Sequence, residues 1–424
     1  MHDFRVLRDQ VDTLRSAMHR RGKLEVLAPL IDRGVALDLE RRAMIQAVEE
    51  RKAARNVNSQ EVARRKKGRE DADALIAQGR ALGDEIAQLE RELGVAEREL
   101  QQVLLELPNL PLDEVPEGDE SQNRVEKSWG TPRAVDGLKP HWELAESLGI
   151  LDLVRGAKVA GSGFVVLRGA GARLTRSLMN FFIDVHTLEH GYEEVWVPAV
   201  VNRASMTATG QLPKFEADLY GVTGEELFLI PTAEVPVTNL YRDEILDGSE
   251  LPRGFVAYTP CFRREAGAAG KDTRGLLRLH QFDKVEIVRY TTAEQSPEEH
   301  ERLTRHAESL LERLGLPYRR VLLAAGDTGQ SSAKTWDLEA WAPGVGRWLE
   351  VSSCSTFTDY QGRRANIRYR PAPGEKPRFV HTLNGSGLAF PRVIACLLEH
   401  YQQADGSIVI PEALRAYLGT DVLR

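Results

Sequence analysis

Apolar residues recur at alternating intervals of four and three between positions 75 and 107. With Gly79 filling one step, they are Leu75, Leu82, Ile86, Leu89, Leu93, Ala96, Leu100, Val103 and Leu107. This spacing keeps one apolar stripe along a helix and predicts a long coiled-coil helix. Residues 37–62 are also rich in helix formers, and the basic segment 64–69 between the two contains a glycine suited to chain reversal. We therefore expect an antiparallel helical hairpin with positive charge at its tip.

Beyond a proline-rich, acidic stretch at 108–130, which we interpret as a linker, short apolar runs typical of strands replace the helical pattern. They are 163–167, 192–198, 226–230, 254–259, 282–290, 319–325 and 347–352. Helices are expected at 174–190, 297–314 and 388–403. Because most neighbouring strands lack a helix between them, the pattern favours an α+β fold with a mainly antiparallel sheet flanked by helices. We expect two domains, a helical arm at 1–110 and a second domain at 111–424.

Composition narrows the class of protein. The chain has 424 residues, of which 42% are apolar and 28% charged, as in a soluble globular protein. No apolar run is long enough to cross a bilayer, and the charged N-terminus lacks a signal-peptide core, so we expect a cytoplasmic protein with no membrane partner. Cys261, Cys354 and Cys396 form no C-x-x-C pair, which argues against a disulfide framework or a cysteine zinc site. The net charge of -7 argues against nonspecific coating of nucleic acid but permits a local basic patch.

Some short motifs have simpler explanations than catalysis. His186-Thr-Leu-Glu-His190 matches a zinc-peptidase string, but no further acidic ligand is clearly placed, and histidines are common in a last helical turn. The segment 267–272, GAAGKD, lacks the spacing of a P-loop. Gly385-Ser-Gly387 lacks the third glycine of a dinucleotide fingerprint, and we interpret it as a turn.

Two other segments carry residues suited to binding a nucleotide. In Phe262-Arg263-Arg264-Glu265, a strand would place Arg263 and Glu265 on one face, where one could clamp a phosphate and the other accept from a base amino group. The alternative is an exposed hairpin with an ordinary ion pair. In the segment 384–393, a glycine turn would lead into an apolar helix with Arg392 at its anion-favouring start. The alternative here is a buried helix with a surface arginine.

Together these segments resemble motifs 2 and 3 of the class II aminoacyl-tRNA synthetases, through F-R-x-E and G-x-G-L-A-x-x-R. Pro198, at the end of VWVP, resembles the motif 1 proline, whose element forms the dimer interface in that class. Thr232-Ala233-Glu234 resembles the serine-binding element of the seryl-tRNA synthetases. The N-terminal hairpin and the segments 210–215, 262–286, 331–341 and 350–364 are similar to that family too. The resemblance covers nearly the whole chain, in the order of the family.

The resemblance implies a homodimer that uses ATP, with Mg²⁺ and without zinc, to activate L-serine and transfer it to tRNA(Ser). Whether tRNA(Sec) is also served stays open. It implies catalytic roles for Arg263, Glu350 and Arg392, and Mg²⁺ ligation through ATP by Glu350 and Ser353. The implied ATP contacts are Arg263, Arg264, Glu265, Glu350, Val351, Ser352, Ser353 and Arg392. The implied serine contacts are Thr232, Ala233, Glu234, Glu286 and Ser386. The implied tRNA contacts are Arg64, Arg65, Lys66, Lys67 and Arg69.

Two positions depart from the family pattern. Arg264 stands where a small residue is usual, and Leu279 replaces the expected glutamine in R-Q-H-Q-F, so ATP contacts near both are open. Rival interpretations are a paralogue that passes seryl-adenylate to another acceptor, a non-catalytic relative, and a coiled-coil scaffold. The full-length arm argues against the first, the retained site charges against the second, and the large second domain against the third.

Overall fold

The computed structural model describes residues 1–266 and 274–424, so the GAAGKD segment lies outside the described residues. The chain divides into two compact units, Met1–Pro108 and Asn109–Arg424. Within the described residues, no helix combines the length and the apolarity needed to cross a membrane.

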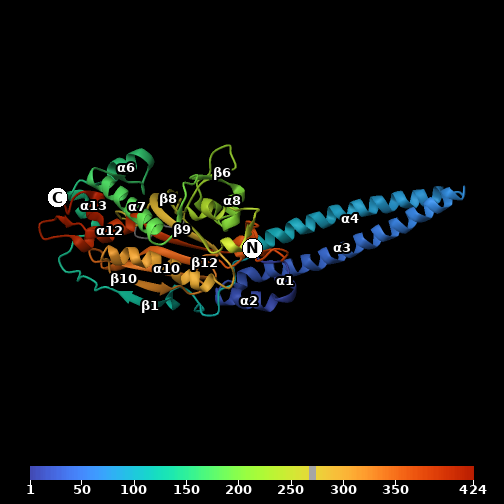
Figure 1. Ribbon diagram of the computed structural model, residues 1–424, viewed down its shortest axis with the longest axis horizontal. Helices are drawn as coiled ribbons and strands as arrows, with labels where there is room; N and C mark the ends of the chain where they lie inside the picture. Colours follow the sequence, from blue (N-terminus) through green and yellow to red (C-terminus); the bar gives the residue numbers. More distant parts are fainter. Residues whose placement is uncertain (267–273) are drawn as a thin grey trace. The chain divides into compact units, whose positions relative to one another are not determined.

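The first unit is helical, and its two long helices run antiparallel side by side (Figure 1). Its helices are α1 Val6–Asp9, α2 Val11–Arg20, α3 Leu24–Lys67 and α4 Asp73–Glu106. The expected hairpin is therefore confirmed. Gly79 has a packing reason to interrupt the apolar stripe, because a Cβ there would lie 2.9 Å from the Asn58 amide nitrogen. That same amide donates to the Leu75 carbonyl at 2.8 Å and joins the helices near the tip.

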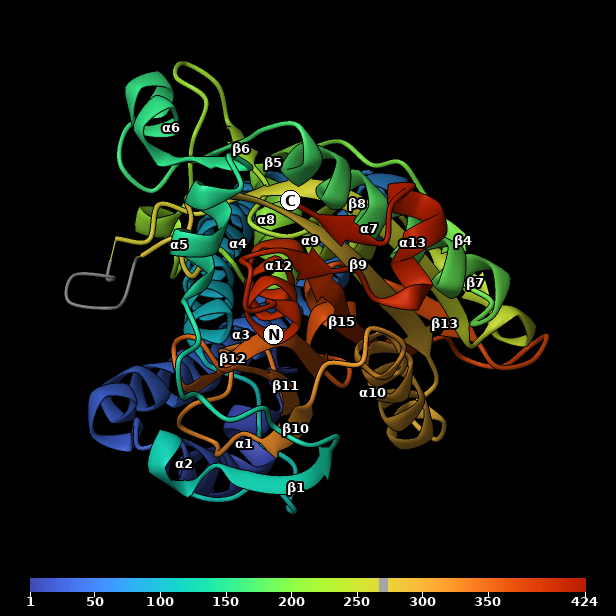
Figure 2. The same cartoon turned by 90° about the vertical axis from the view of Figure 1, so that its left-hand side faces the viewer.

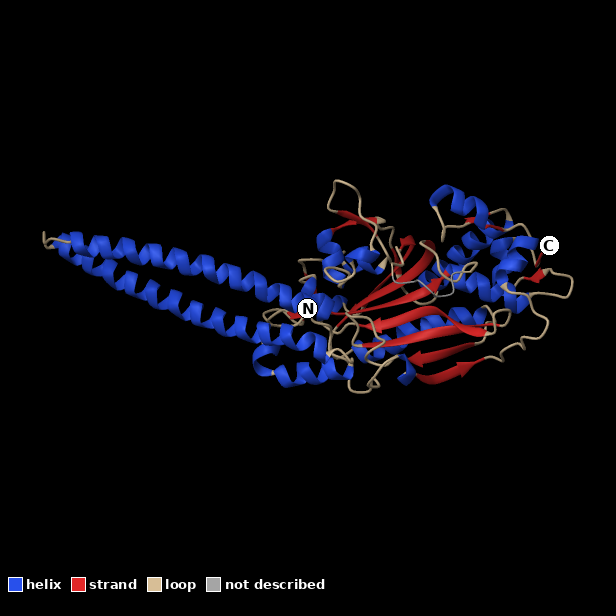
Figure 3. Cartoon of the chain, turned by 180° about the vertical axis from the view of Figure 1, so that it is seen from behind, coloured by secondary structure: helices blue, strands red, loops and turns tan. Residues whose placement is uncertain are grey.

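A sheet organises the second unit (Figure 3). It has eight strands in the order β1-β10-β11-β12-β15-β9-β8-β4. Every pair is antiparallel except β4 with β8, so the expected mainly antiparallel sheet is confirmed. The strands are β1 Arg124–Trp129, β4 Glu193–Glu194, β8 Arg253–Phe262, β9 Gln281–Thr291, β10 Tyr318–Leu322, β11 Lys334–Ala342, β12 Arg347–Thr356 and β15 His381–Ala389. The strand pattern missed β1, which lies inside the expected linker, and also β11 and β15.

Helices α7 Ala170–Leu188, α10 Ser296–Arg313 and α12 Phe390–Tyr401 pack on the sheet (Figure 2). Strand β9 shows how the helices distinguish the two faces of the sheet. Val285 and Ile287 join the core beneath these helices, whereas Lys284 and Glu286 point to the opposite face. Smaller elements surround the sheet. They are α5 His141–Ser147, α6 Leu153–Ala160, α8 Arg203–Thr209, α9 Glu234–Thr238, α11 Tyr360–Arg364, α13 Glu412–Leu418, β2 Leu151–Asp152, β3 Val166–Leu167, β5 Val200–Asn202, β6 Leu227–Leu229, β7 Ile245–Asp247, β13 Arg368–Arg370, β14 Arg378–Phe379, β16 Ile408–Val409 and β17 Val422–Leu423.

The expected turn at Gly385-Ser-Gly387 is wrong, because these residues lie within β15 and the helix begins only at Phe390. The glycines serve close packing rather than chain reversal. A Cβ on Gly385 would lie 2.6 Å from a Leu303 methyl group, and one on Gly387 would lie 2.4 Å from Nε2 of His186. The strand can therefore pass between its neighbours only without side chains at these two positions.

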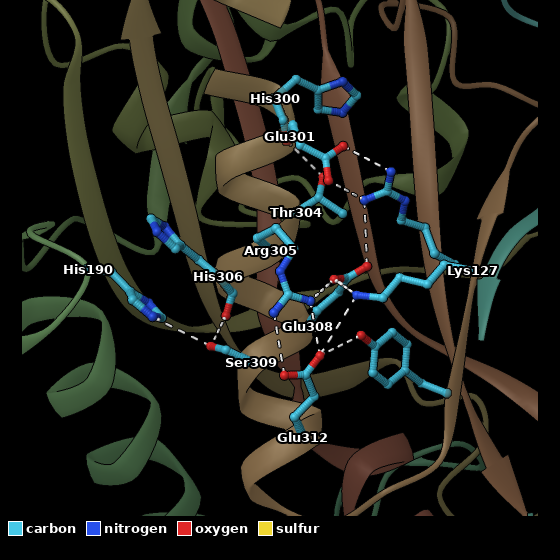
Figure 4. A network of polar contacts seen from close by, with 12 residues as sticks. Lys127, His190, His300, Glu301, Thr304, Arg305, His306, Glu308, Ser309 and Glu312 are labelled. Carbon is cyan, nitrogen blue, oxygen red and sulfur yellow. Dashed lines mark hydrogen bonds and ion pairs between the residues drawn. The ribbon is translucent and has the colours of Figure 1, made fainter. Parts of the chain in front are cut away.

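Helix α10 is tied to the edge of the sheet by a polar network (Figure 4). Lys127 of β1 donates to the fully buried Glu308 carboxylate at 2.6 Å, and Arg305 contacts the same group. One turn further on, Glu312 accepts from the Tyr318 hydroxyl of β10 at 2.9 Å. The buried carboxylate is thus compensated by charge, as a buried ion requires.

A second buried carboxylate, Glu399 of α12, fastens that helix to neighbouring segments. It accepts from the backbone and the ring Nδ1 of His141 at 2.9 and 2.7 Å. It also accepts from the backbone amides of Gly344 and Val345 at 2.8 and 3.1 Å. Removal of this one carboxylate would leave four donors without an acceptor.

We expect Glu399→Ala to destabilise the second unit by about 3 kcal/mol, because buried donors are left unsatisfied. Calorimetric melting of the full chain measures the effect. Glu399→Gln, which keeps one acceptor oxygen, should lose less. The exposed Glu143 of α5 offers the control, since Glu143→Ala should stay within about 0.5 kcal/mol. Equal losses in the alanine and control variants would contradict the assigned role of Glu399.

Candidate functional site

A cavity of about 640 Å³ opens on the sheet face opposite the helices. Its walls come from α9, the β8–β9 region, β12, β15 and the start of α12. Among the expected site residues, those lining it are Thr232, Glu234, Arg263, Glu265, Glu350, Val351, Ser353, Ser386 and Arg392. Four others among the expected ATP and serine contacts do not line it. Ala233, Ser352 and Glu286 are buried beside it, and Arg264 is exposed outside it.

At one end of the cavity, Glu234 lines the wall and Glu286 is buried beside it, and one amide joins the two carboxylates. The Asn384 side chain donates to Glu234 at 3.1 Å and to Glu286 at 2.7 Å. Gln361 donates to the other Glu234 oxygen at 2.7 Å, and its own carbonyl accepts from Thr382. These residues come from α9, β9, β15 and α11, so the acidic pair exists only in the folded chain.

The charge of this end depends on pH. Burial, followed by repulsion from Glu286, raises the pKa of Glu234 to about 7. The Gln361 hydrogen bond and the positive charges of Lys284 and Arg263 act in the opposite direction on this pKa. Glu234 therefore titrates near neutral pH.

Lys284 is the cation of the acidic end. Its side chain is nearly buried, and its ammonium forms an ion pair with Glu286 and donates to the Thr232 hydroxyl at 2.9 Å. The same hydroxyl oxygen accepts from the backbone amide of Glu234 at 3.2 Å. Because a hydroxyl oxygen has two lone pairs, Thr232 cannot accept from a ligand ammonium while both bonds persist.

The other end of the cavity is basic. Arg263 lies 5.2 Å from the centre of the Phe282 ring and donates to the Pro231 carbonyl. The expectation that a strand carries Arg263 and Glu265 is wrong, because β8 ends at Phe262. Glu265 has a left-handed backbone with φ of 52°, which is uncommon for a residue with a side chain, and its carboxylate pairs with Arg278.

Arg392, in the first turn of α12, is aimed by backbone carbonyls. It donates to Leu277 O at 3.2 Å and to Glu350 O at 2.8 Å, and lies 3.3 Å from the Glu350 carboxylate. Glu350 and Ser353 both line the cavity and offer a carboxylate and a hydroxyl, the hard oxygen ligands that suit Mg²⁺. Ser353 is hydrogen-bonded to Asp337, and burial together with repulsion from Glu350 raises the pKa of Asp337 well above its usual value.

The histidines of the zinc-peptidase string contact each other. Nδ1 of His186 and Nδ1 of His190 lie 3.0 Å apart, and the His190 ring stacks on His306 at 4.0 Å. Burial lowers the pKa of His190 to about 4 and that of His306 to about 3. In the described part of the chain, no group of three or more His, Cys, Asp or Glu side chains is arranged to hold a metal ion.

The basic tip of the arm divides into paired and unpaired cations. Arg64 and Arg65 both bind Glu61, which lowers the pKa of that carboxyl to about 2. Across the described residues, Lys66, Lys67 and Arg69 have no acidic partner. All three are exposed, so the available positive charge of the tip resides on them.

Sequence reasoning assigned no role to several cavity residues. Lys284 and Asn384 could have been found from strand period, since each lies two positions from an expected serine contact on the same strand. Arg278 lies in the R-L-H-Q-F string, although its pairing with Glu265 depends on the turn after β8. Gln361 had no such signal, because nothing near it in sequence belongs to the acidic pair.

Comparison with known proteins finds matches in both units of the chain. A family model for the class II tRNA synthetase core domain (G, H, P, S and T) matches residues 215–401, and one for the seryl-tRNA synthetase N-terminal domain matches residues 1–111. The chain is 65% identical to the serine–tRNA ligase of Gemmatimonas aurantiaca over the full length of both, and 53% identical to that of Geobacillus kaustophilus, again over both full lengths. The seryl-tRNA synthetase of Pyrococcus horikoshii, solved in complex with ATP, matches with a TM-score of 0.96 and 38% identity over 100% of this chain and 99% of that one.

The antiparallel sheet with its cavity and the core-domain match define a class II aminoacyl-tRNA synthetase. Within this class, the helical arm and the relatives that match over the full length identify one family. The chain belongs to the seryl-tRNA synthetase family.

The pKa of Glu234 makes a prediction about stability. Because its folded-state pKa of about 7 exceeds the ordinary 4.5, the folded chain binds more protons between these pH values. The proton bound to folded Glu234 stabilises the folded chain. This stabilisation is complete below the ordinary pKa and is lost as pH rises through the pKa of the folded state. From about pH 5 to 8, the wild type should lose on the order of 2–3 kcal/mol relative to Glu234→Gln. Calorimetric melting across this range measures the difference, and parallel curves would refute it. The exposed Glu244 provides the control, since Glu244→Gln should follow the wild type.

Proposed function

We propose that this chain activates L-serine with ATP and transfers the seryl group to tRNA(Ser). In the first step a serine carboxylate oxygen attacks the α-phosphorus, and the bond to pyrophosphate breaks. In the second step a hydroxyl of the terminal adenosine of the tRNA attacks the seryl carbonyl, and AMP leaves. The observation that carries the proposal is one cavity that has Glu234, joined through Asn384 to the buried Glu286, at one end and arginines at the other.

The acidic end suits a small amino acid with a hydroxyl group. Glu234 is the acceptor for the serine ammonium, since Thr232 has both lone pairs in use. The backbone at Thr232 and Ala233 supports the wall of this subsite. Glu286 and Ser386 receive the serine hydroxyl; they are register partners on β9 and β15. Binding of a cation to Glu234 favours its ionised form, so serine should release a proton near neutral pH.

The basic end suits a nucleoside triphosphate. Arg263 holds the α-phosphate and offsets the charge that develops as the carboxylate attacks. Phe282, which Arg263 overlies, offers a stacking face for adenine, and Glu265 accepts from the adenine amino group. Arg392 binds the γ-phosphate from a position fixed by two carbonyls. Mg²⁺ held with ATP at Glu350 and Ser353 would neutralise phosphate charge.

The unpaired cations at the tip of the arm suit an RNA backbone, which is the role we give them. We also propose a homodimer, supported by Trp196 and Leu188, which are 88% and 81% exposed beside the motif 1 segment. We further propose a cytoplasmic location, in keeping with a composition typical of soluble globular proteins. Service of tRNA(Sec) has no support in the residues of the cavity.

Serine-dependent exchange of pyrophosphate into ATP tests the first step, with alanine, threonine and cysteine as competitors. Exchange with serine well above the others is expected. Charging of total tRNA with labelled serine then tests the second step. Exchange without charging would favour the paralogue that uses another acceptor, and absence of both would refute the proposed function.

Glu286→Ala should raise the KM for serine by roughly 10- to 100-fold, because it removes one hydrogen bond to a charged acceptor. The KM for ATP should change little. Pyrophosphate exchange at varied serine and ATP gives both values. The exposed Glu244→Ala is the matched control and should leave both constants unchanged. An equal rise for serine and ATP would count against the assignment of Glu286.

Replacing Lys66, Lys67 and Arg69 together by glutamine should weaken tRNA binding and reduce its dependence on salt, since each lost phosphate contact lowers the slope by roughly 0.7–0.9. Filter binding from low to high salt measures this. The double variant Arg64→Gln and Arg65→Gln should do less, because Glu61 already neutralises these side chains. Adenylate formation should be unaffected in both. A collapse of pyrophosphate exchange in the triple variant would show that the arm has another role.

A further inference from the structure

The acidic end of the cavity contains an asymmetry in its charges. Of its two carboxylates, Glu286 has the Lys284 ammonium as an ion-pair partner, whereas Glu234 is hydrogen-bonded by the amides of Asn384 and Gln361 and forms no ion pair within the described residues. Both acids are nearly removed from solvent, and Glu286 is fully buried. An ammonium placed on one of two coupled carboxylates decides which of them keeps a proton.

Other titratable groups around this end do not compete for that role. From β8, Cys261 is buried and its thiol pKa is raised, so it is neutral. From β12, burial raises the pKa of the Cys354 thiol to about 12, so it is neutral too. Arg263, after β8, acts on Glu234 from a distance and donates to the Pro231 carbonyl. In the described residues, β15 and α11 contribute only the neutral Asn384, Ser386 and Gln361.

We infer that Lys284 is a positioning residue for substrate selection: it holds Glu286 ionised and oriented as acceptor for the serine hydroxyl, and leaves Glu234 to exchange its proton for the serine ammonium. This inference rests on the proposed function. Its geometry is simple, because Lys284 and Glu286 share one face of β9 and the ammonium also holds the Thr232 hydroxyl at 2.9 Å. The exchanged proton leaves to solvent.

Selection of serine over alanine follows if Glu286 carries the negative charge and Glu234 carries the proton before serine binds. Both Glu286 oxygens already have partners, Asn384 on one and Lys284 on the other. An ionised acceptor forms a hydrogen bond roughly twice as strong as a neutral one. Without the ammonium, the two acids would share a proton, and Glu286 would become a weaker and less defined acceptor. A space-filling role for the lysine would have no such consequence for alanine.

The test compares Lys284→Met, Lys284→Arg and the control Lys334→Met in the full-length protein. Lys334 is a mostly buried lysine of β11 that pairs with Glu114 at 3.1 Å and lies outside the cavity. In pyrophosphate exchange, Lys284→Met should lower the preference for serine over alanine in kcat/KM by ~10-fold. The KM for ATP should stay within about twofold of the wild type. Lys284→Arg should restore most of the preference, and Lys334→Met should leave it unchanged.

The pH profile is a second readout. In Lys284→Met, kcat/KM for serine should rise more steeply from about pH 7 to 9 than in the wild type, because the shared proton must leave first. A preference and a profile that match those of the wild type would overturn the inference. An equal loss for serine and ATP would overturn it in favour of a structural role.

If Lys284→Met does not fold, the wild type still tests the part of the inference in which Glu234 exchanges its proton for the serine ammonium. Calorimetry of serine binding in buffers of different ionisation heat should show release of a sizeable fraction of one proton near pH 7. No release would overturn the inference. Failure of the wild type to exchange pyrophosphate with serine would instead refute the proposed function.

Discussion

Two carboxylates that share one amide in a buried pocket are the constraint on which the second unit is built. Two ionised carboxylates that share one amide donor repel each other, and burial removes the water that would screen this repulsion. Asn384 can bridge Glu234 and Glu286 only if β15 lies close to β9 and α9. The next residue, Gly385, lets the same strand pass close to Leu303 of α10, so neighbouring positions of β15 serve the cavity and the packing of the helix.

Three carboxylates in or beside the cavity are each held by a cation of the same site, whereas Glu234 is held by amides. Glu265 pairs with Arg278, Glu350 with Arg392, and Glu286 with Lys284. These ion pairs keep the carboxylates ordered in the absence of a ligand. They also determine which contacts a ligand must replace when it binds. Under the proposed function, the adenine amino group would compete with Arg278 for Glu265, and a phosphate would compete with Glu350 for Arg392. Substrate binding at this site is thus a change of partners among charges already in place, which limits the reorganisation that binding requires.

The sequence predicted the parts of the molecule whose signals are local. The stripe from residue 75 to 107 predicted α4, because heptad spacing needs no knowledge of the partner helix. The glycines of β15 led to a wrong prediction, because glycine occurs both at turns and at close approaches of neighbouring segments. Only the positions of Leu303 and His186 distinguish the two cases. The left-handed backbone of Glu265 and the contact of Gln361 with Glu234 depend on distant segments, so no local pattern contained them.

The partners of Glu286 also bear on how strongly the pocket can reject alanine. A site whose polar group is left bare by the wrong substrate can discriminate by ~10⁴-fold. If Glu286 accepts the serine hydroxyl as proposed, Asn384 and Lys284 stay on the carboxylate when the hydroxyl is missing, so alanine forfeits one charge-assisted bond and leaves no bare charge. Such a bond contributes about 1.5–3 kcal/mol, or roughly 10- to 150-fold. Larger discrimination must come from the Ser386 side of the subsite or from the transition state, where the position of the serine carboxylate is coupled to Arg263.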